Sequence, residues 1–306
     1  MKAVRHAVFG AQGEAAIVPE AWSAIDLSIL HGILLVIGAS DTGKSTFAGW
    51  LFDQLVQTGN KVAFLDGDVG QSNLGPPTTL TLALSALDVP HDGPDVVRWF
   101  VGDVSPRGHM LPLVVGAGRL VQRASESGAE TVVMDTTGLV DLAHGGVPLK
   151  HALVDQLQPT TLFAFQRTGE LEPILAPLRR LPRPRVVELP VSDAVHQRDV
   201  GTRQVHRADA FRRYFERAGI MRLPLRGRAV FNGSVFAPRR LLALQDADGF
   251  TLALGVIVTY DEARDELDVR TPLTKPERVA SIQLGAVGID VATGRELRPG
   301  RSGRIR

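Results

Sequence analysis

Eight consecutive residues near the start of the chain have the types and spacing needed to hold a chain of phosphate groups. They are Gly38, Ala39, Ser40, Asp41, Thr42, Gly43, Lys44 and Ser45. They fit the pattern G-x-x-x-x-G-K-S/T, whose glycines let backbone N–H groups point at phosphate oxygens. The lysine of this pattern reaches the outer phosphates, and the hydroxyl after it binds Mg²⁺. We therefore predict these roles for Lys44 and Ser45, and we include Thr46 in the nucleotide-binding segment.

The flanking residues supply the context that this motif requires. An apolar run at 33–37 leads into the loop, and a helix-compatible run at 46–52 follows it. A strand, a loop and a helix in this order place the positive N-terminal end of the helix at the phosphates. A chance match to a glycine-rich turn would not need these neighbours.

A second group of polar residues follows the next apolar run, at 61–65. It contains Asp66, Asp68 and Gln71. At the end of a strand beside the phosphate loop, a carboxylate can accept the proton of a hydroxyl or hold metal-bound water. The carboxylates of Asp66 and Asp68 are the candidates for this role, and Gln71 can orient a water or a phosphate oxygen. An acidic turn without catalytic function is the alternative.

A third acidic group, Asp135, follows the apolar run at 131–134. In phosphate-loop proteins an aspartate in this place usually helps to hold Mg²⁺, with water between. The metal-binding residues that we predict are therefore Ser45, Asp68 and Asp135. The alternative for Asp135 is a cap of the next segment.

Arginines are concentrated late in the chain. The 34 basic residues include only five lysines, and residues 198–217 contain six arginines. We interpret residues 194–217 as a lid whose Arg198, Arg203 and Arg207 surround a transferring phosphoryl group. Acidic residues are interspersed in this segment, so a solvated helix face is the alternative.

Apolar strands alternate with helical segments over most of the chain. This pattern predicts an α/β fold, a phosphate-loop NTPase with a parallel sheet that helices cover on both faces. The carboxyl ends of such strands converge on one edge, where ligands bind. From about residue 222 short β-like runs separated by turns predict a small β-rich domain. We expect a short N-terminal segment at 1–27, a main domain at 28–220 and the β-rich domain at 221–306.

The composition excludes several classes of protein. The chain contains no cysteine, which rules out disulfides and thiolate metal sites. Its apolar runs are too short to cross a bilayer, and no signal peptide is recognisable at the N-terminus. We therefore expect a cytoplasmic protein that does not bind membranes.

Together these motifs resemble one family, the polynucleotide 5′-hydroxyl kinases related to the mRNA cleavage-and-polyadenylation factor kinase and the pre-ribosomal RNA-processing kinases. The resemblance covers about residues 28–218. It rests on the phosphate loop with Asp41 inside it, on the D-x-G-Q element from Asp68 to Gln71, and on the arginine-rich lid. Where eukaryotic members have Asn-Thr-x-Gly-Trp, this chain has Asp135 and ends the element with Leu139, so a stacking tryptophan is missing.

The resemblance implies transfer of the γ-phosphate of ATP, with Mg²⁺, to the 5′-hydroxyl end of RNA or DNA. It assigns phosphate and metal binding to Lys44 and Ser45, base chemistry to Asp68, and phosphoryl stabilisation to the lid arginines. Two other functions stay open. One is a kinase for a small molecule such as a nucleoside. The other is an ATP-binding scaffold without turnover in an RNA-processing assembly. The sequence identifies no protein partner.

Overall fold

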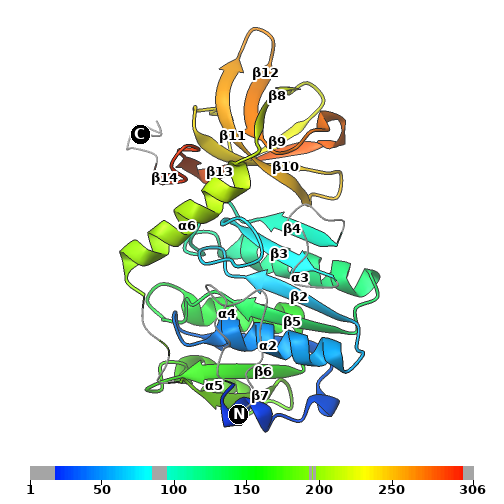
Figure 1. Ribbon diagram of the computed structural model, residues 1–306, viewed down its shortest axis with the longest axis vertical. Coiled ribbons are helices and arrows are strands. Elements are labelled where there is room, and N and C mark those ends of the chain that lie inside the picture. Colours follow the sequence, from blue (N-terminus) through cyan, green and yellow to red (C-terminus); the bar gives the residue numbers. More distant parts are fainter. Residues whose placement is uncertain (1–17, 85–94, 193–194, 196–197, 299–306) are drawn as a thin grey trace.

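The computed structural model describes residues 18–84, 95–192, 195 and 198–298. Two sheets lie one above the other in the view of Figure 1, and a long helix runs diagonally between them. No helix within these ranges is long and apolar enough to span a membrane.

The first sheet has seven strands in the order β4-β3-β2-β5-β1-β6-β7. Their bounds are Gly32–Gly38 (β1), Val62–Gly67 (β2), Thr79–Ala83 (β3), Val96–Phe100 (β4), Thr131–Thr136 (β5), Thr161–Gln166 (β6) and Arg185–Pro190 (β7). The predicted phosphate-loop fold with a β-rich C-terminal part is confirmed. One difference is β3, which runs antiparallel to both β2 and β4 and which the sequence analysis did not predict.

Helices cover both faces of this sheet. One face carries α3 (Met110–Glu126), α4 (Gly146–Leu157) and α5 (Glu172–Leu178), and the other carries α2 (Lys44–Gln57) with the short α1 (Glu20–Ser23) and η2 (Leu27–Ile29). Alternate residues of β1 enter the two cores, because successive strand side chains point to opposite faces. Burial on both faces explains why this strand is apolar throughout.

The second sheet has the order β14-β13-β10-β11-β12-β8, and β9 pairs with β13. Its strands are Gly219–Pro224 (β8), Ala229–Phe231 (β9), Arg240–Gln245 (β10), Thr251–Asp261 (β11), Glu266–Thr271 (β12), Ser281–Ile289 (β13) and Glu296–Leu297 (β14). The turn η3 (Pro276–Arg278) lies between β12 and β13. Every pair except β9–β13 is antiparallel.

Helix α6 (Val200–Phe215) connects the two sheets. Phe211 and Phe215 at its C-terminal end are buried in the core beneath the second sheet. The hydroxyl of Tyr214 accepts a hydrogen bond from the backbone N–H of Leu254 in β11, at 2.8 Å. The C-terminal half of the predicted lid helix is therefore anchored in the second sheet.

Candidate active site

The carboxyl ends of β2, β5 and β1, which are adjacent strands, bring the three predicted motifs together. The register pairs Asp66 of β2 with Asp135 of β5, and Asp135 with Val36 of β1. The phosphate loop continues from the end of β1, two residues beyond Val36. The sequence prediction that these motifs share one edge of the sheet is therefore correct.

The phosphate loop has the backbone geometry that its glycines predict. Gly43, at φ 83°, is in the left-handed region just before α2 begins at Lys44. A Cβ atom on Gly38 would lie 2.6 Å from the hydroxyl oxygen of Thr42. That hydroxyl donates a 3.0 Å hydrogen bond to the carbonyl of Ala39, which closes the loop on itself. The loop therefore has the wrapped form that the motif predicts.

The turn after β5 supports the phosphate loop from the side. A Cβ atom on Gly138 would lie 2.5 Å from the hydroxyl oxygen of Ser40 and 2.7 Å from its backbone nitrogen. The hydroxyl of Thr136, at the end of β5, donates to the carbonyl of Val36 at 2.8 Å. The Thr-x-Gly turn is thus a packing partner of the phosphate loop.

The two aspartates after β2 have different roles. The buried carboxylate of Asp66 accepts four hydrogen bonds of 2.8–3.1 Å, from the hydroxyl of Ser72 and the backbone N–H groups of residues 68, 73 and 74. Burial raises its pKa, although these hydrogen bonds oppose the shift. Asp66 therefore shapes the loop and has little capacity left for a ligand.

Asp68 keeps one carboxylate oxygen available. Its Oδ1 accepts from the backbone N–H groups of Gly70 and Gln71, each at 3.0 Å. Its Oδ2 accepts no hydrogen bond from any residue that the structure describes. The side chain is fixed in direction and only partly buried, which suits a group that accepts a proton.

Gln71 connects this loop to the lid helix. Its Nε2 donates to the carbonyl of Gly70 at 2.7 Å and to the carbonyl of Arg203 in α6 at 3.3 Å. Its Oε1 is buried and accepts no hydrogen bond within the described residues. Gln71 therefore presents an unsatisfied acceptor beside the lid.

Asp135 is a second acid at this edge whose pKa is raised by burial. It is 1% exposed, and burial raises its pKa to about 7, against the opposing charge of Lys44. Its Oδ1 has no hydrogen-bond partner among the residues described. A buried carboxylate oxygen without a donor is an acceptor prepared for a cation or a bound water.

Lys150 is a functional candidate that the sequence analysis missed. It is fully buried in α4, and its Nζ donates to the hydroxyl of Thr136 at 2.8 Å and to the carbonyl of Thr137 at 2.6 Å. Burial and the charge of Lys44 lower its pKa to about 7, while Asp68 and Asp135 oppose the shift. A signal was present, because a lysine occupies the buried stripe of an otherwise apolar helix face.

Two of the predicted lid arginines are held by Asp41 of the phosphate loop. The Asp41 carboxylate accepts from Arg198 Nε at 3.0 Å, from the Arg198 backbone N–H at 3.1 Å and from Arg203 Nη2 at 3.2 Å. The Asp41 side chain is 3% exposed. Partial burial raises its pKa, but the hydrogen bonds and charge of Arg198, with Arg203, hold the pKa below its ordinary value. The lid thus contacts the loop through an ion pair.

Arg207 lies elsewhere. Its Nε donates to Glu296 of β14, so its contact is with the second sheet and not with the phosphate loop. A cavity of about 840 Å³ lies between α6, the loop after β4 and residues 293–298. Charged side chains on its wall are Arg207, Arg295, Arg298, Asp209 and Glu296, and Arg207 pairs with Glu296 while Arg298 pairs with Asp103. A Cβ atom on Gly70 would lie 2.6 Å from the carbonyl oxygen of Val104, another wall residue, so the cavity adjoins the Asp68 loop.

Comparisons with known proteins agree with this geometry. The family described as the mRNA cleavage and polyadenylation factor CLP1 P-loop matches residues 38–217. The chain belongs to this family. Curated members similar to it include the polyribonucleotide 5′-hydroxyl-kinase of Pyrococcus furiosus, which is 25% identical over 84% of this chain and 87% of its own length. The Pyrococcus horikoshii enzyme of the same name is 31% identical over 66% of this chain and 55% of its own.

Solved structures of the CLP1 family share the fold. The Clp1p–Pcf11p complex described for its extended interface contains a chain with a TM-score of 0.66 to this one, at 12% identity. The match covers 86% of this chain and 76% of that chain. The predicted resemblance is confirmed, and the fold extends beyond the phosphate-loop domain.

Gly138→Ala should weaken nucleotide binding in this CLP1-family protein. The new methyl group would overlap the backbone of Ser40, and relief of such overlap costs about 1–3 kcal/mol. We expect ATP affinity to fall roughly 5- to 100-fold in calorimetric titrations. Gly219→Ala is the matched control, since nothing lies within 4 Å of a Cβ atom there. Equal affinities of both variants would contradict the packing role of Gly138.

Asp41→Asn should loosen the start of the lid helix in the nucleotide-free protein. Loss of a partly exposed, charge-assisted pair is worth about 1 kcal/mol, which corresponds to roughly fivefold faster hydrogen exchange of the α6 N-terminal amides. Asp209→Asn is the control, because Asp209 pairs with Arg212 within α6 and touches no loop. Unchanged exchange in Asp41→Asn would show that the ion pair does not hold the lid.

Proposed function

We propose that this protein is an ATP- and Mg²⁺-dependent polynucleotide 5′-hydroxyl kinase that prefers RNA. The observation that carries the proposal is the position of Asp68, which follows β2 at the same sheet edge as the phosphate loop and has one carboxylate oxygen without a hydrogen-bond donor among the described residues. The names of the archaeal relatives support the same activity and the preference for RNA.

The donor nucleotide occupies the phosphate loop. Backbone N–H groups of residues 38–45 and the N-terminal end of α2 bind its phosphate oxygens. Lys44, which is buried at the start of α2, neutralises charge on the outer phosphates. Asp41 keeps Arg198 and Arg203 close to this loop, so that they contact the γ-phosphate when it is present.

Mg²⁺ fits the residues at this edge. Ser45 contributes its hydroxyl, and Asp135 offers the oxygen that lacks a donor. No three acidic or histidine side chains in the described part of the chain could hold a metal by themselves. This agrees with the usual binding of Mg²⁺ through one or two protein groups, water and substrate phosphates. When bound, the ion neutralises charge that develops on the phosphates.

Asp68 acts on the acceptor. Its free Oδ2 accepts the proton of the 5′-hydroxyl as the oxygen attacks the γ-phosphorus, and the bond to the β-phosphate oxygen breaks. The backbone of Val104 packs against Gly70 of the Asp68 loop, and the cavity begins there. Arg295 on its wall, which forms no ion pair among the described residues, suits an acceptor that carries phosphodiesters.

The two other functions differ in their expected substrates. A small-molecule kinase would phosphorylate free nucleosides as well as it phosphorylates oligomers, and a scaffold would bind ATP without turnover. Asp68 and two of the three predicted lid arginines, Arg198 and Arg203, lie beside the phosphate loop, which favours the enzyme. The volume of this cavity, about 840 Å³, favours a polynucleotide acceptor over a nucleoside.

Transfer of labelled phosphate from ATP to 5′-hydroxyl RNA, DNA and nucleosides tests this function directly. We expect transfer to oligomers, and we expect Lys44→Ala to abolish it. Asp68→Asn should lower the transfer rate by about 10²- to 10⁴-fold, the usual contribution of a general base, with ATP affinity largely retained. The exposed Asp155 of α4 offers a control variant, Asp155→Asn, that should be fully active. A fully active Asp68→Asn enzyme would refute the base role, and ATP binding without transfer to any acceptor would refute the kinase.

Mg²⁺ binding should depend on pH through Asp135. Its pKa of about 7 lies above the ordinary value of 3.8, so the folded protein retains a proton that the unfolded chain loses between these values. The metal-free stability that this proton contributes is complete below about pH 4 and is lost as pH rises through 7. Mg²⁺ requires the ionised form, so its apparent affinity should fall up to about tenfold per pH unit below 7. Lys44, Asp66, Asp68 and Lys150 surround this carboxyl group.

Thermal unfolding with and without Mg²⁺ at pH 6 and pH 8 checks this dependence. Mg²⁺ should raise the Tm more at pH 8 than at pH 6. Asp135→Asn should remove the difference between the two pH values, which separates Asp135 from the neighbouring Lys150. Asp155→Asn should preserve it. An equal Mg²⁺ shift at both pH values in the unmodified protein would contradict the assignment.

A further inference from the structure

A second cavity, of about 530 Å³, lies between the edge of the first sheet and the second sheet. Its walls are β4, the start of β11, the end of α3 and the segment from 272 to 278 that contains η3. Strand β4 begins here with Val96, and its other end leads to the loop beside Asp68. The cavity is therefore separate from the site at the ends of β1, β2 and β5. Strand β4 leads from this cavity to Val104, which packs against Gly70 of the Asp68 loop.

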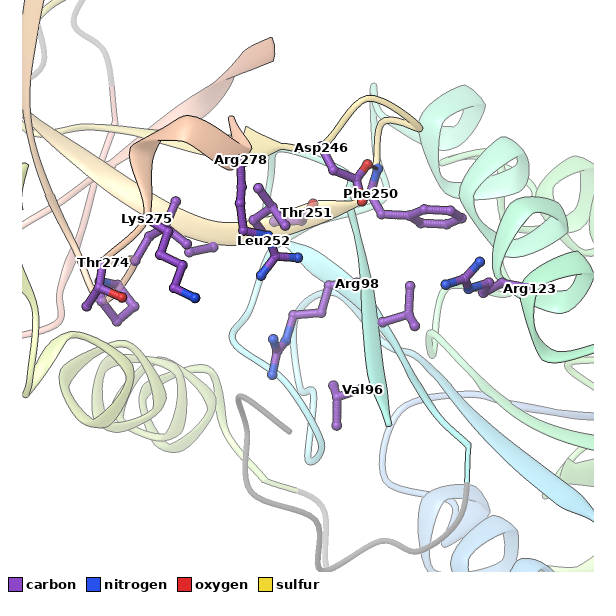
Figure 2. A pocket seen from close by; sticks show the side chains of 14 residues that line it. Val96, Arg98, Arg123, Asp246, Phe250, Thr251, Leu252, Thr274, Lys275 and Arg278 are labelled. Atoms are coloured by element: carbon purple, nitrogen blue, oxygen red, sulfur yellow. Dashed lines mark hydrogen bonds between the residues drawn. The ribbon is translucent and has the colours of Figure 1, made fainter. Parts of the chain in front are cut away.

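Positive charge dominates this cavity. Its basic residues are Arg98, Arg123, Lys275 and Arg278, and Asp246 is the single acid among the described residues that line it. Figure 2 shows the side chains of Arg98, Lys275 and Arg278 extending toward a common space, with Arg123 on the other side beside Phe250. Oδ1 of Asp246 accepts hydrogen bonds from the backbone N–H groups of residues 248 and 250, so this acid holds a turn.

Two of these cations have no partner in the described chain. Neither Lys275 nor Arg278 forms an ion pair there, and both side chains are exposed. Because neither of these two like charges is paired with an acid, they repel each other, and a bound anion removes that repulsion. The arrangement therefore suits an anionic ligand.

A buried hydroxyl points to a ligand independently of the charges. Thr251 lines the cavity and is only 6% exposed, yet its Oγ1 has no hydrogen-bond partner among the described residues. A buried hydroxyl without a hydrogen-bond partner is unfavourable, and native proteins rarely leave one without a reason. An oxygen of a bound ligand would satisfy it.

We propose that this cavity binds phosphate groups. Guanidinium and ammonium groups around a hydroxyl donor are the chemistry that phosphate oxygens require. The phosphates have two possible sources, the backbone of a polynucleotide held away from its reacting 5′ end and a free nucleotide. The first source rests on the proposed kinase function, and the second does not.

The test compares two double variants that each remove two cations. Lys275→Ala/Arg278→Ala alters the cavity. Arg226→Ala/Arg264→Ala removes two exposed arginines that lie in turns of the second sheet and do not line the cavity; Arg264 pairs with Asp261. Fluorescence anisotropy with a 3′-labelled single-stranded 20-mer RNA measures binding at several salt concentrations. We expect the cavity variant to bind at least tenfold more weakly, with a salt slope reduced by about 1.4, since each phosphate contact on a single strand contributes roughly 0.7. The control variant should change affinity less than twofold.

Calorimetric titration with ADP distinguishes the free nucleotide. A second ADP site that the cavity variant loses, with unchanged RNA affinity, supports the nucleotide source. A loss of RNA affinity with a single ADP site in both variants supports the polynucleotide. If the cavity and control variants bind both ligands equally, the proposal is overturned.

Thr251→Val tests the same site without a change in its charge. Removal of an unsatisfied hydroxyl should raise the Tm of the ligand-free protein and weaken RNA or ADP binding severalfold. A raised Tm with unchanged binding of both ligands would show that the hydroxyl faces no ligand. Binding is measured here without phosphate transfer, so a protein that fails as a kinase can still confirm this site.

Discussion

The parallel pairing of β2, β5 and β1 is the constraint on which the site depends. Because Asp66 lies opposite Asp135 and Asp135 opposite Val36, the loops after these strands must begin at the same height. This alignment alone places the carboxyl groups of Asp66 and Asp135 beside the phosphate loop. A slip of one residue in this register would turn the buried acids to the other face of the sheet. The alignment of these apolar strands therefore determines which acidic side chains lie beside the phosphate loop.

That alignment also concentrates charge where water is scarce. Asp66, Asp135 and Lys150 are all buried beside the phosphate loop. Burial moves Asp135 and Lys150 toward neutrality in opposite directions, so both titrate near pH 7. Perturbed groups of this kind are typical of functional sites because their protonation responds to small changes in nearby charge. The binding of a nucleotide with its metal ion would change the charge near these groups strongly.

The sequence predicted the parts of this protein that follow from local patterns. Strand ends marked by polar residues located the phosphate loop, Asp68 and Asp135 at one edge. The antiparallel β3 was missed because it follows a proline-rich turn and its direction depends on its neighbours. Lys150 was missed because its role depends on a contact between α4 and the turn after β5, which no spacing reveals. The contact of Arg207 with Glu296 likewise requires the second sheet to be in place.

The anchoring of α6 has a mechanical consequence. Its C-terminal end is fixed in the second sheet by Phe211, Phe215 and the hydroxyl of Tyr214, while Arg198 and Arg203 contact the phosphate loop near the other end. A stiff rod fixed at one end transmits displacement to the other. A ligand that moved the second sheet would therefore also move the arginines at the phosphate loop, without contact with the nucleotide. Helix α6 thus connects the second sheet mechanically to the edge of the first sheet where the phosphate loop lies.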